Sequence, residues 1–205
     1  MNLLIEHINV MGSFVFAISG ALVALRNKLD LFGVFIVAFV TAVGGGTIRD
    51  MLLADRDVFW LFDMDIIYAI IAGALIAIIF RGKLHFFKKP IFFYDAIGLG
   101  IFTITGVQIG IDTHLTPLIC ILLGTVTGVF GGVIRDIIVN EIPVVFQKEI
   151  YATASVFGGI LYLVLDHFEI STVYLYSIPI TCIILIRIIA VTYNISLPNI
   201  YKNEK

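Results

Sequence analysis

The chain has 205 residues, a formal net charge of −2, 60% hydrophobic and 14% charged residues, and a mean hydropathy of +1.07. Soluble domains carry about 25% charged residues, so this composition excludes a water-soluble surface. The small negative charge excludes a basic surface for nucleic acid. The composition therefore predicts an all-α protein whose main partner is the lipid bilayer.

Seven apolar stretches have roughly the 17–25 residues that a membrane-spanning helix needs, although the third and sixth are short. In chain order the predicted spans are residues 8–25, 31–53, 66–80, 91–111, 115–139, 150–165 and 171–191. The breaks between them are short and polar. The sequence predicts a single transmembrane domain over residues 1–205, with a C-terminal tail at 192–205.

Basic residues in the breaks predict the orientation of the spans, because Lys and Arg accumulate on the cytoplasmic side. The first, third and fifth breaks and the C-terminal tail share one side, and the opposite side holds only Arg56. An odd number of spans then places the N-terminus outside and the C-terminus in the cytoplasm. The basic residues of the cytoplasmic side are Arg26, Lys28, Arg81, Lys83, Lys88, Lys89, Lys148, Lys202 and Lys205.

An internal repeat relates the first three spans to the next three at a constant offset of 86 residues. The block Gly-Gly-Thr-Ile-Arg-Asp at 45–50 recurs as Gly-Gly-Val-Ile-Arg-Asp at 131–136, and glycines 12, 20 and 73 recur at 98, 106 and 159. Three spans per copy is an odd number, so the second copy enters the membrane from the opposite face. The prediction is an inverted repeat, with copies at about 8–80 and 91–166 and a seventh helix at about 171–191.

Glycines interrupt the second and fifth spans at equivalent places, Gly44–Gly46 and Gly131–Gly132. Each glycine costs about 1 kcal/mol relative to alanine in a helix, so we expect a kink or an unwound turn there. Freed carbonyls at membrane depth need a partner, and a monovalent cation suits them. The predicted cation ligands are the backbone carbonyls of Gly44, Gly45, Phe130 and Gly131.

Close helix packing is the alternative role for these small residues. Gly124, Gly128 and Gly132 recur every four residues on the fifth span, and Ala38, Ala42 and Gly46 recur likewise on the second. We expect this stripe to be packing. Gly45 and Gly131 lie one residue off the stripe and are the better candidates for the bend.

An arginine and an aspartate follow each glycine run: Arg49 with Asp50, and Arg135 with Asp136. Adjacent helical residues point about 100° apart, which disfavours pairing within a motif. Pairing between repeats, Arg49 with Asp136 and Arg135 with Asp50, is natural under the pseudo-twofold axis. These charges line a conduction path, lock the two halves together, or do both.

Other polar residues in the spans have less specific roles. Ser13, Ser19, Thr103 and Thr105 either line the path or bond to backbone carbonyls. Asp95 is expected to be a first-turn helix residue rather than part of a site. Arg187 is expected to extend toward the cytoplasmic interface.

No combination of residues typical of catalysis occurs, such as a His-Glu-x-x-His motif or a phosphate loop. We therefore predict a protein that is not an enzyme and that needs no cofactor. Potassium or sodium ions are expected only as permeant species.

The doubled motif at 44–50 and 131–136 resembles the prokaryotic branch of the trimeric intracellular cation (TRIC) channel family, which also carries a glycine-transporter label. The resemblance implies seven spans in a bacterial or archaeal inner membrane, a three-plus-three inverted repeat and a homotrimer with one pore in each subunit. It also implies potassium and sodium permeation past kinked second and fifth helices. Phe130 stands where the first copy has Gly44, which departs from the doubled pattern.

The predicted function is a monovalent cation channel. A secondary transporter of a small solute such as glycine is the main alternative, because inverted repeats with broken helices are typical of transporters too. A non-conducting membrane scaffold is the third possibility. Ion flux and solute uptake, measured side by side, distinguish the three.

Overall fold

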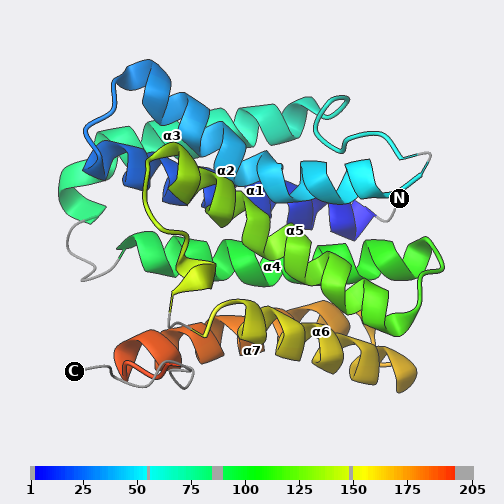
Figure 1. Cartoon of the computed structure of the whole chain (residues 1–205). Coiled ribbons are helices and arrows are strands. Elements are labelled where there is room, and N and C mark those ends of the chain that lie inside the picture. The colour runs from blue at the N-terminus through cyan, green and yellow to red at the C-terminus, as the bar shows by residue number, and fades with distance from the viewer. Residues whose placement is uncertain (1–2, 55, 85–89, 148–149, 197–205) are drawn as a thin grey trace.

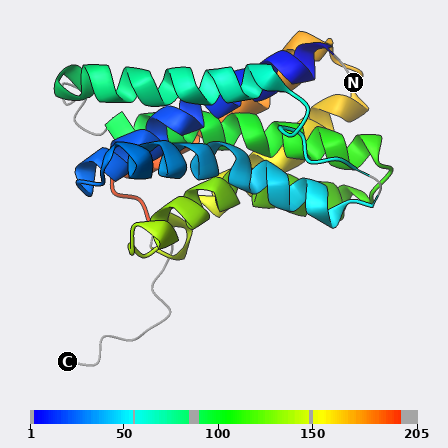
Figure 2. The ribbon, with the colours of Figure 1, turned by 90° about the horizontal axis from the view of Figure 1, so that it is seen from above.

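The computed structural model describes residues 3–54, 56–84, 90–147 and 150–196. Over these residues the chain forms seven α-helices and one short 3-10 helix, and most of the helices run roughly along one direction (Figure 1 and Figure 2). Helix α1 begins and helix α7 ends at opposite ends of the bundle (Figure 1), as an odd number of spans requires. The bounds are α1 Leu3–Arg26, α2 Leu31–Leu52, α3 Met64–Leu84, α4 Pro90–Asp112, α5 Pro117–Ile138, η1 Val144–Phe146, α6 Ala152–His167 and α7 Thr172–Thr192.

The seven predicted spans are confirmed, with ends that move by a few residues. Helix α1 shows the largest difference, because it starts at Leu3 and carries Glu6 and Asn9 within its first turns. Among the described residues, six helices are long and apolar enough to cross a membrane, and α6 is a shorter apolar helix of 16 residues. The C-terminal tail beyond residue 196 lies outside the described residues.

The first and fourth helices end in the same way, 86 residues apart. Lys28 and His114 both adopt a left-handed backbone with φ of 57°. In each case the amide of the next residue donates to a carbonyl five residues earlier, at 3.1 and 3.0 Å. This pattern closes a helix by satisfying its last carbonyls, so the repeat extends to the details of the helix ends.

Reciprocal contacts between α1 and α4 confirm the inverted repeat. Gly12 of α1 faces the ring of Phe102, and its repeat counterpart Gly98 of α4 faces the ring of Phe16. The two rings stack with their centroids 5.3 Å apart. Because each contact maps onto the other at the offset of 86, the two copies are related by a pseudo-twofold axis that passes near these rings.

Helices α2 and α5 cross at two equivalent glycines. Gly45 faces the carbonyl oxygen of Thr127, and Gly131 faces the carbonyl oxygen of Thr41, so closely that a Cβ atom at either glycine would overlap that oxygen. Both helices remain α-helical through these positions, so the predicted unwound turn is wrong. Gly45 and Gly131 allow two antiparallel backbones to touch, and the bend expected at them stays a prediction.

The small-residue stripe is confirmed as packing for α5 against α4. A Cβ on Gly124 would meet the carbonyl oxygen of Thr103 at 2.6 Å, and one on Gly128 would meet the carbonyl oxygen of Leu99 at 2.9 Å. Small residues allow this approach, and the van der Waals packing that results contributes to the association of helices in lipid.

The buried apolar core divides along the repeat. One cluster joins side chains of α1, α2 and α3, and Phe102 of α4 packs into it. The other joins α4, α5, α6 and α7, and Ile5 of α1 packs into it. Helix α7 has no counterpart in the first copy and packs against α4 and α6. The two motifs with buried charge therefore lie in two separate halves of one bundle.

Candidate functional site: two buried arginine–aspartate clusters

The repeat-one cluster consists of Arg49, Asp50 and Arg56. Arg49 donates from Nε and Nη2 to the two carboxylate oxygens of Asp50, at 2.8 and 2.9 Å, and neither side chain is exposed. Asp50 also accepts from Arg56 Nε at 3.0 Å and from the Phe59 amide at 3.0 Å. The Phe59 ring covers the Arg49 guanidinium, 5.3 Å from its centroid. Asp50 thereby ties the end of α2 to the chain that follows it.

The repeat-two cluster consists of Arg135, Asp136, Asp95 and Ser19. Arg135 Nε donates to Asp136 at 2.8 Å, while its Nη1 donates to Asp95 at 2.6 Å and to Ser19 at 2.9 Å. Asp136 also accepts from the Val144 amide at 3.2 Å. One arginine of α5 is therefore bound to α4 and to α1, which joins the two halves of the bundle.

Burial makes these ion pairs costly to break. The two arginines and their partner aspartates are at most 4% exposed. Removing one member of a buried pair leaves an uncompensated charge and costs about 3–5 kcal/mol. Charge of this kind at membrane depth is typical of ion paths and binding sites.

The predicted pairing between repeats is wrong. Each arginine bonds to the aspartate next to it in the sequence, because its side chain is long enough to reach that carboxylate. The antiparallel crossing explains why the other pairing is absent. Its midpoint lies at residues 43 and 129, and Arg49 and Arg135 each lie six residues later. At about 1.5 Å per residue, each stands about 9 Å from the crossing, in opposite directions.

Asp95 belongs to the site, which sequence reasoning missed. It lies six positions into α4, in the second turn, and is 3% exposed. Its carboxylate pairs with Arg135 across two helices. The available signal was its charge inside an apolar span, together with the offset of 86 that aligns it with the polar Asn9.

Arg187 is likewise buried rather than extended to the membrane surface. Its guanidinium lies between the rings of Phe92 and Tyr151, 4.9 and 4.5 Å from their centroids. It donates to the Ile150 carbonyl at 3.0 Å. The Tyr151 hydroxyl would also lie 3.0 Å from a Cβ atom on Gly132, in the motif of α5. Arg187 of α7 therefore lies beside the repeat-two cluster.

The four predicted hydroxyl residues are all fully buried, but their roles differ. Ser19 accepts from Arg135, and Thr105 donates to the Phe102 carbonyl at 3.2 Å. Within the described part of the chain, the hydroxyls of Ser13 and Thr103 have no hydrogen-bond partner. Buried polar atoms that lack a protein partner are commonly satisfied by water.

The predicted carbonyl ligands lie within continuous helices. Gly44 and Gly45 belong to α2, and Phe130 and Gly131 belong to α5. Their carbonyls are not freed by an unwound turn, so the side-chain clusters are the stronger candidates for the site. Among the described residues, no group of three or more His, Cys, Asp or Glu side chains could hold a metal ion.

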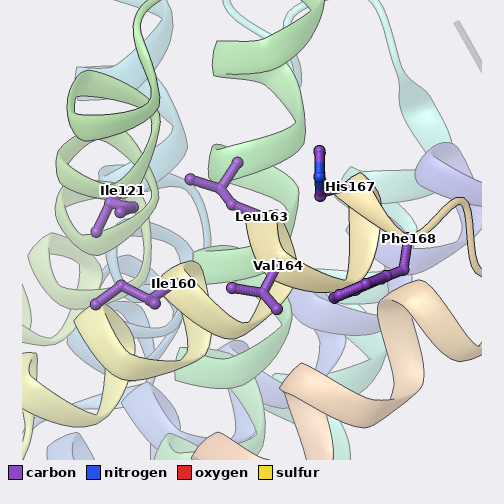
Figure 3. A pocket seen from close by; sticks show the side chains of 6 residues that line it. All are labelled: Ile121, Ile160, Leu163, Val164, His167 and Phe168. Atoms are coloured by element: carbon purple, nitrogen blue, oxygen red, sulfur yellow. The ribbon is translucent and has the colours of Figure 1, made fainter.

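A separate pocket lies between α5 and α6, where Ile121 faces Ile160, Leu163 and Val164 (Figure 3). Its volume is about 270 Å³, and His167 and Phe168 complete its lining. Its lining includes no member of either cluster and is almost entirely apolar. The pocket therefore suits hydrocarbon and is not a candidate ion site.

Comparisons with known proteins agree with this fold. A family model described as glycine transporter matches the chain twice, at residues 6–82 and 92–167, which are the two repeats. The UPF0126 inner membrane protein YadS of Escherichia coli K12 is 36% identical, over 98% of this chain and 99% of its own length. A UPF0126 membrane protein of Vibrio cholerae is 41% identical, over 93% of this chain and 80% of its own length.

Solved structures of bacterial TRIC channels superpose on nearly the whole chain. The orthologue from Rhodobacter sphaeroides has a TM-score of 0.83 at 30% identity, covering 95% of this chain and 100% of its own. A prokaryotic TRIC channel has a TM-score of 0.85 at 31% identity, covering 96% of this chain and 100% of its own. With the doubled family match, these likenesses establish that the chain belongs to the prokaryotic TRIC channel family, whose sequence model is described as glycine transporter.

Proposed function

We propose that this protein is a cation channel of the bacterial inner membrane. The observation that carries the proposal is the likeness of nearly the whole chain to channels of known structure, at TM-scores of 0.82 to 0.85. The two buried arginine–aspartate clusters support it, because ionisable groups in a membrane span usually border a water-filled path. The name YadS, an inner membrane protein in Escherichia coli, supports the location.

The proposed path follows helices α2 and α5 through each subunit. Asp50 and Asp136 lie in the last turns of these antiparallel helices, so each end of the path has at least one carboxylate beside an arginine. Among the described residues, the buried hydroxyls of Ser13 and Thr103 have no hydrogen-bond partner, and they suit a hydrated ion. We propose potassium and sodium as the permeant ions.

We also propose a homotrimer with one pore in each subunit, because the solved relative is described as a trimeric channel. The N-terminus is proposed to lie outside and the C-terminus in the cytoplasm, on the evidence of the basic residues in the connections. Light scattering of the detergent-solubilised protein measures the assembly. A membrane-impermeant thiol reagent, applied to intact cells that carry Lys28→Cys, tests the sidedness: the proposed orientation predicts protection until the membrane is permeabilised.

Glycine transport is the second candidate, and the description of the matching family model favours it. A transporter moves solute by alternating access, so its uptake saturates and shows counterflow. A channel conducts through a continuous path and carries many ions per opening. Saturable uptake with counterflow is therefore expected of a transporter, and ion flux through an open path is expected of a channel.

The experiment that tests the proposal compares potassium flux and glycine uptake in liposomes that contain the purified protein. We expect potassium flux that depends on the protein and no saturable glycine uptake. Saturable uptake with counterflow and no ion flux would establish the transporter instead. Absence of both activities would leave a scaffold role.

Two variants separate the cluster from a general charge effect in the same assay. Asp136→Asn removes a buried carboxylate of the repeat-two cluster, whereas Asp57→Asn removes an exposed carboxylate in the connection after α2. We expect reduced flux in Asp136→Asn and normal flux in Asp57→Asn. Equal flux in both variants would remove Asp136 from the path.

A further inference from the structure

The repeat offset pairs position 9 with position 95, and the two positions differ in charge. Asn9 of α1 is 4% exposed and Asp95 of α4 is 3% exposed. Because α1 and α4 begin at opposite ends of the bundle (Figure 1), the two positions lie toward opposite ends of the proposed path. Repeat one therefore has a neutral amide where repeat two has a carboxylate.

The hydrogen bonds around the two arginines reflect this difference. Arg135 Nη1 donates to Asp95 Oδ1 at 2.6 Å. In the described residues, the equivalent nitrogen, Arg49 Nη1, has no partner, and neither has Asn9 Oδ1. Arg49 Nη1 is a buried donor and Asn9 Oδ1 is a buried acceptor, and neither forms the bond that joins Arg135 to Asp95. Buried polar groups of this kind commonly bind ordered water.

A second contact differs in the same sense. Ser19 Oγ accepts from Arg135 Nη1 at 2.9 Å, whereas its repeat counterpart Thr105 donates to a carbonyl of its own helix. The guanidinium of repeat two is therefore held by protein groups on both edges. The guanidinium of Arg49 is held by Asp50 on one edge only.

The two further arginines beside the clusters, one buried and one partly buried, do not offset this difference, because each cluster has one. Arg56 contacts Asp50 in repeat one, and Arg187 lies against Tyr151 beside the repeat-two cluster. Within the two buried clusters, the difference in charge between the repeats therefore comes to a single residue pair, Asn9 and Asp95. Its effect is one additional negative charge at the end of the path where α4 begins.

We propose that positions 9 and 95 set the direction in which the channel rectifies. This inference rests on the proposed cation path. A unit charge about 10 Å away in water changes the local concentration of a monovalent cation about twofold. Cations therefore accumulate at the Asp95 end, and the current from that end toward the Asn9 end exceeds the current in the reverse direction.

The test is single-channel recording in planar bilayers with equal potassium chloride on both sides. A Lys28→Cys background gives the orientation of each channel, because a charged, impermeant thiol reagent reaches the exposed α1–α2 connection from one side only. The wild-type background is compared with Asn9→Asp, with Asp95→Asn and with the double variant that exchanges the two charges. Gel filtration verifies that each variant folds and assembles.

We expect about a twofold ratio between currents at equal and opposite voltages in the wild-type background. Each single variant gives the two buried clusters the same charge, so the ratio moves toward unity. The double variant keeps the total charge and reverses the direction of rectification. Should Asp95→Asn fail to fold, Asn9→Asp alone decides the outcome.

Two negative results have different meanings. A wild-type protein that conducts without rectification, or a double variant that rectifies in the original direction, overturns this inference and leaves the channel intact. A wild-type protein that carries no cation current overturns the proposed function, and the inference fails with it.

Discussion

The two clusters are built from the same short motif, yet their surroundings hold them differently. In each, the arginine binds the aspartate that follows it, and that aspartate accepts an amide from the chain after the helix. In repeat one, Asp50 also forms an ion pair with a second arginine, Arg56. In repeat two, Arg135 also forms an ion pair with a second aspartate, Asp95. The motif thus fixes the local pair, and the tertiary fold decides which charge is added to it.

This difference predicts unequal costs when the arginines are removed, which is the largest effect. Arg135→Met leaves Asp95 and Asp136 buried without a cation, so we expect a loss of about 3–5 kcal/mol or failure to fold. Arg49→Met leaves Asp50 paired with Arg56, so its loss is smaller. Thermal unfolding in detergent, followed by circular dichroism, measures both. Equal losses would contradict the comparison of the clusters.

The crossing of α2 and α5 predicts the next largest effect. Gly45→Ala and Gly131→Ala drive a methyl group into a backbone carbonyl of the facing helix, which we expect to cost about 1–3 kcal/mol or more. Gly44→Ala is the matched control. Its methyl meets only the flexible end of Ile134 at 2.9 Å, with the nearest backbone atom at 3.8 Å. If Gly44→Ala were as destabilising as Gly45→Ala, the proposed role of Gly45 in close backbone packing would be wrong.

A smaller effect is expected at the repeat pair Ser19 and Thr105. Ser19→Ala removes one acceptor of the Arg135 guanidinium, and with Asp95 still in place we expect a loss of about 1 kcal/mol. Thr105→Ala removes only a bond to its own helix and should cost less. The midpoints of thermal unfolding give the comparison, and the reverse order would count against the asymmetry.

The smallest effect is expected outside the membrane-spanning helices, at Glu141. Partial burial acts to raise its pKa, but hydrogen bonds from Asn27 and Arg26 outweigh burial, and its pKa lies below the ordinary 4.5. The ion pair with Arg26, at 2.6 Å, is largely exposed and contributes at most about 1 kcal/mol. A lowered pKa means that this contribution is complete above pH 4.5 and is lost as the pH falls through the lowered value.

Glu141→Gln should therefore lower the free energy of unfolding slightly at neutral pH. In acid, where the wild-type protein has itself lost this ion pair, the variant and the wild type should have the same free energy of unfolding. Unfolding midpoints measured at several pH values test it. A variant that matched the wild type at neutral pH and differed from it in acid would contradict the sign of the effect.

Sequence analysis predicted the helices and the inverted repeat because both depend on patterns that extend over many residues. Long apolar stretches with short polar breaks define the spans, and the offset of 86 aligns five glycines and an Arg-Asp pair. The packing stripe of Gly124 and Gly128 followed from spacing alone. The prediction of the spans, the repeat and the stripe therefore does not depend on the correct interpretation of any single residue.

The details of the site depended on geometry that single-helix reasoning does not contain. The expectation that Arg49 does not face Asp50 well considered only the directions in which the two side chains leave the helix axis. The arginine has enough length and flexibility to turn back. Asp95 was missed because its partner, Arg135, is 40 residues away, and only the packing of α4 on α5 brings them together.

Current through single channels in a planar bilayer tests the central claim, that the two clusters border a cation path. The wild-type protein is predicted to give discrete potassium currents. Asp50→Asn and Asp136→Asn, each verified as folded, are predicted to lower conductance or cation selectivity. Potassium currents that were unchanged in both variants, in conductance and in selectivity, would contradict the claim.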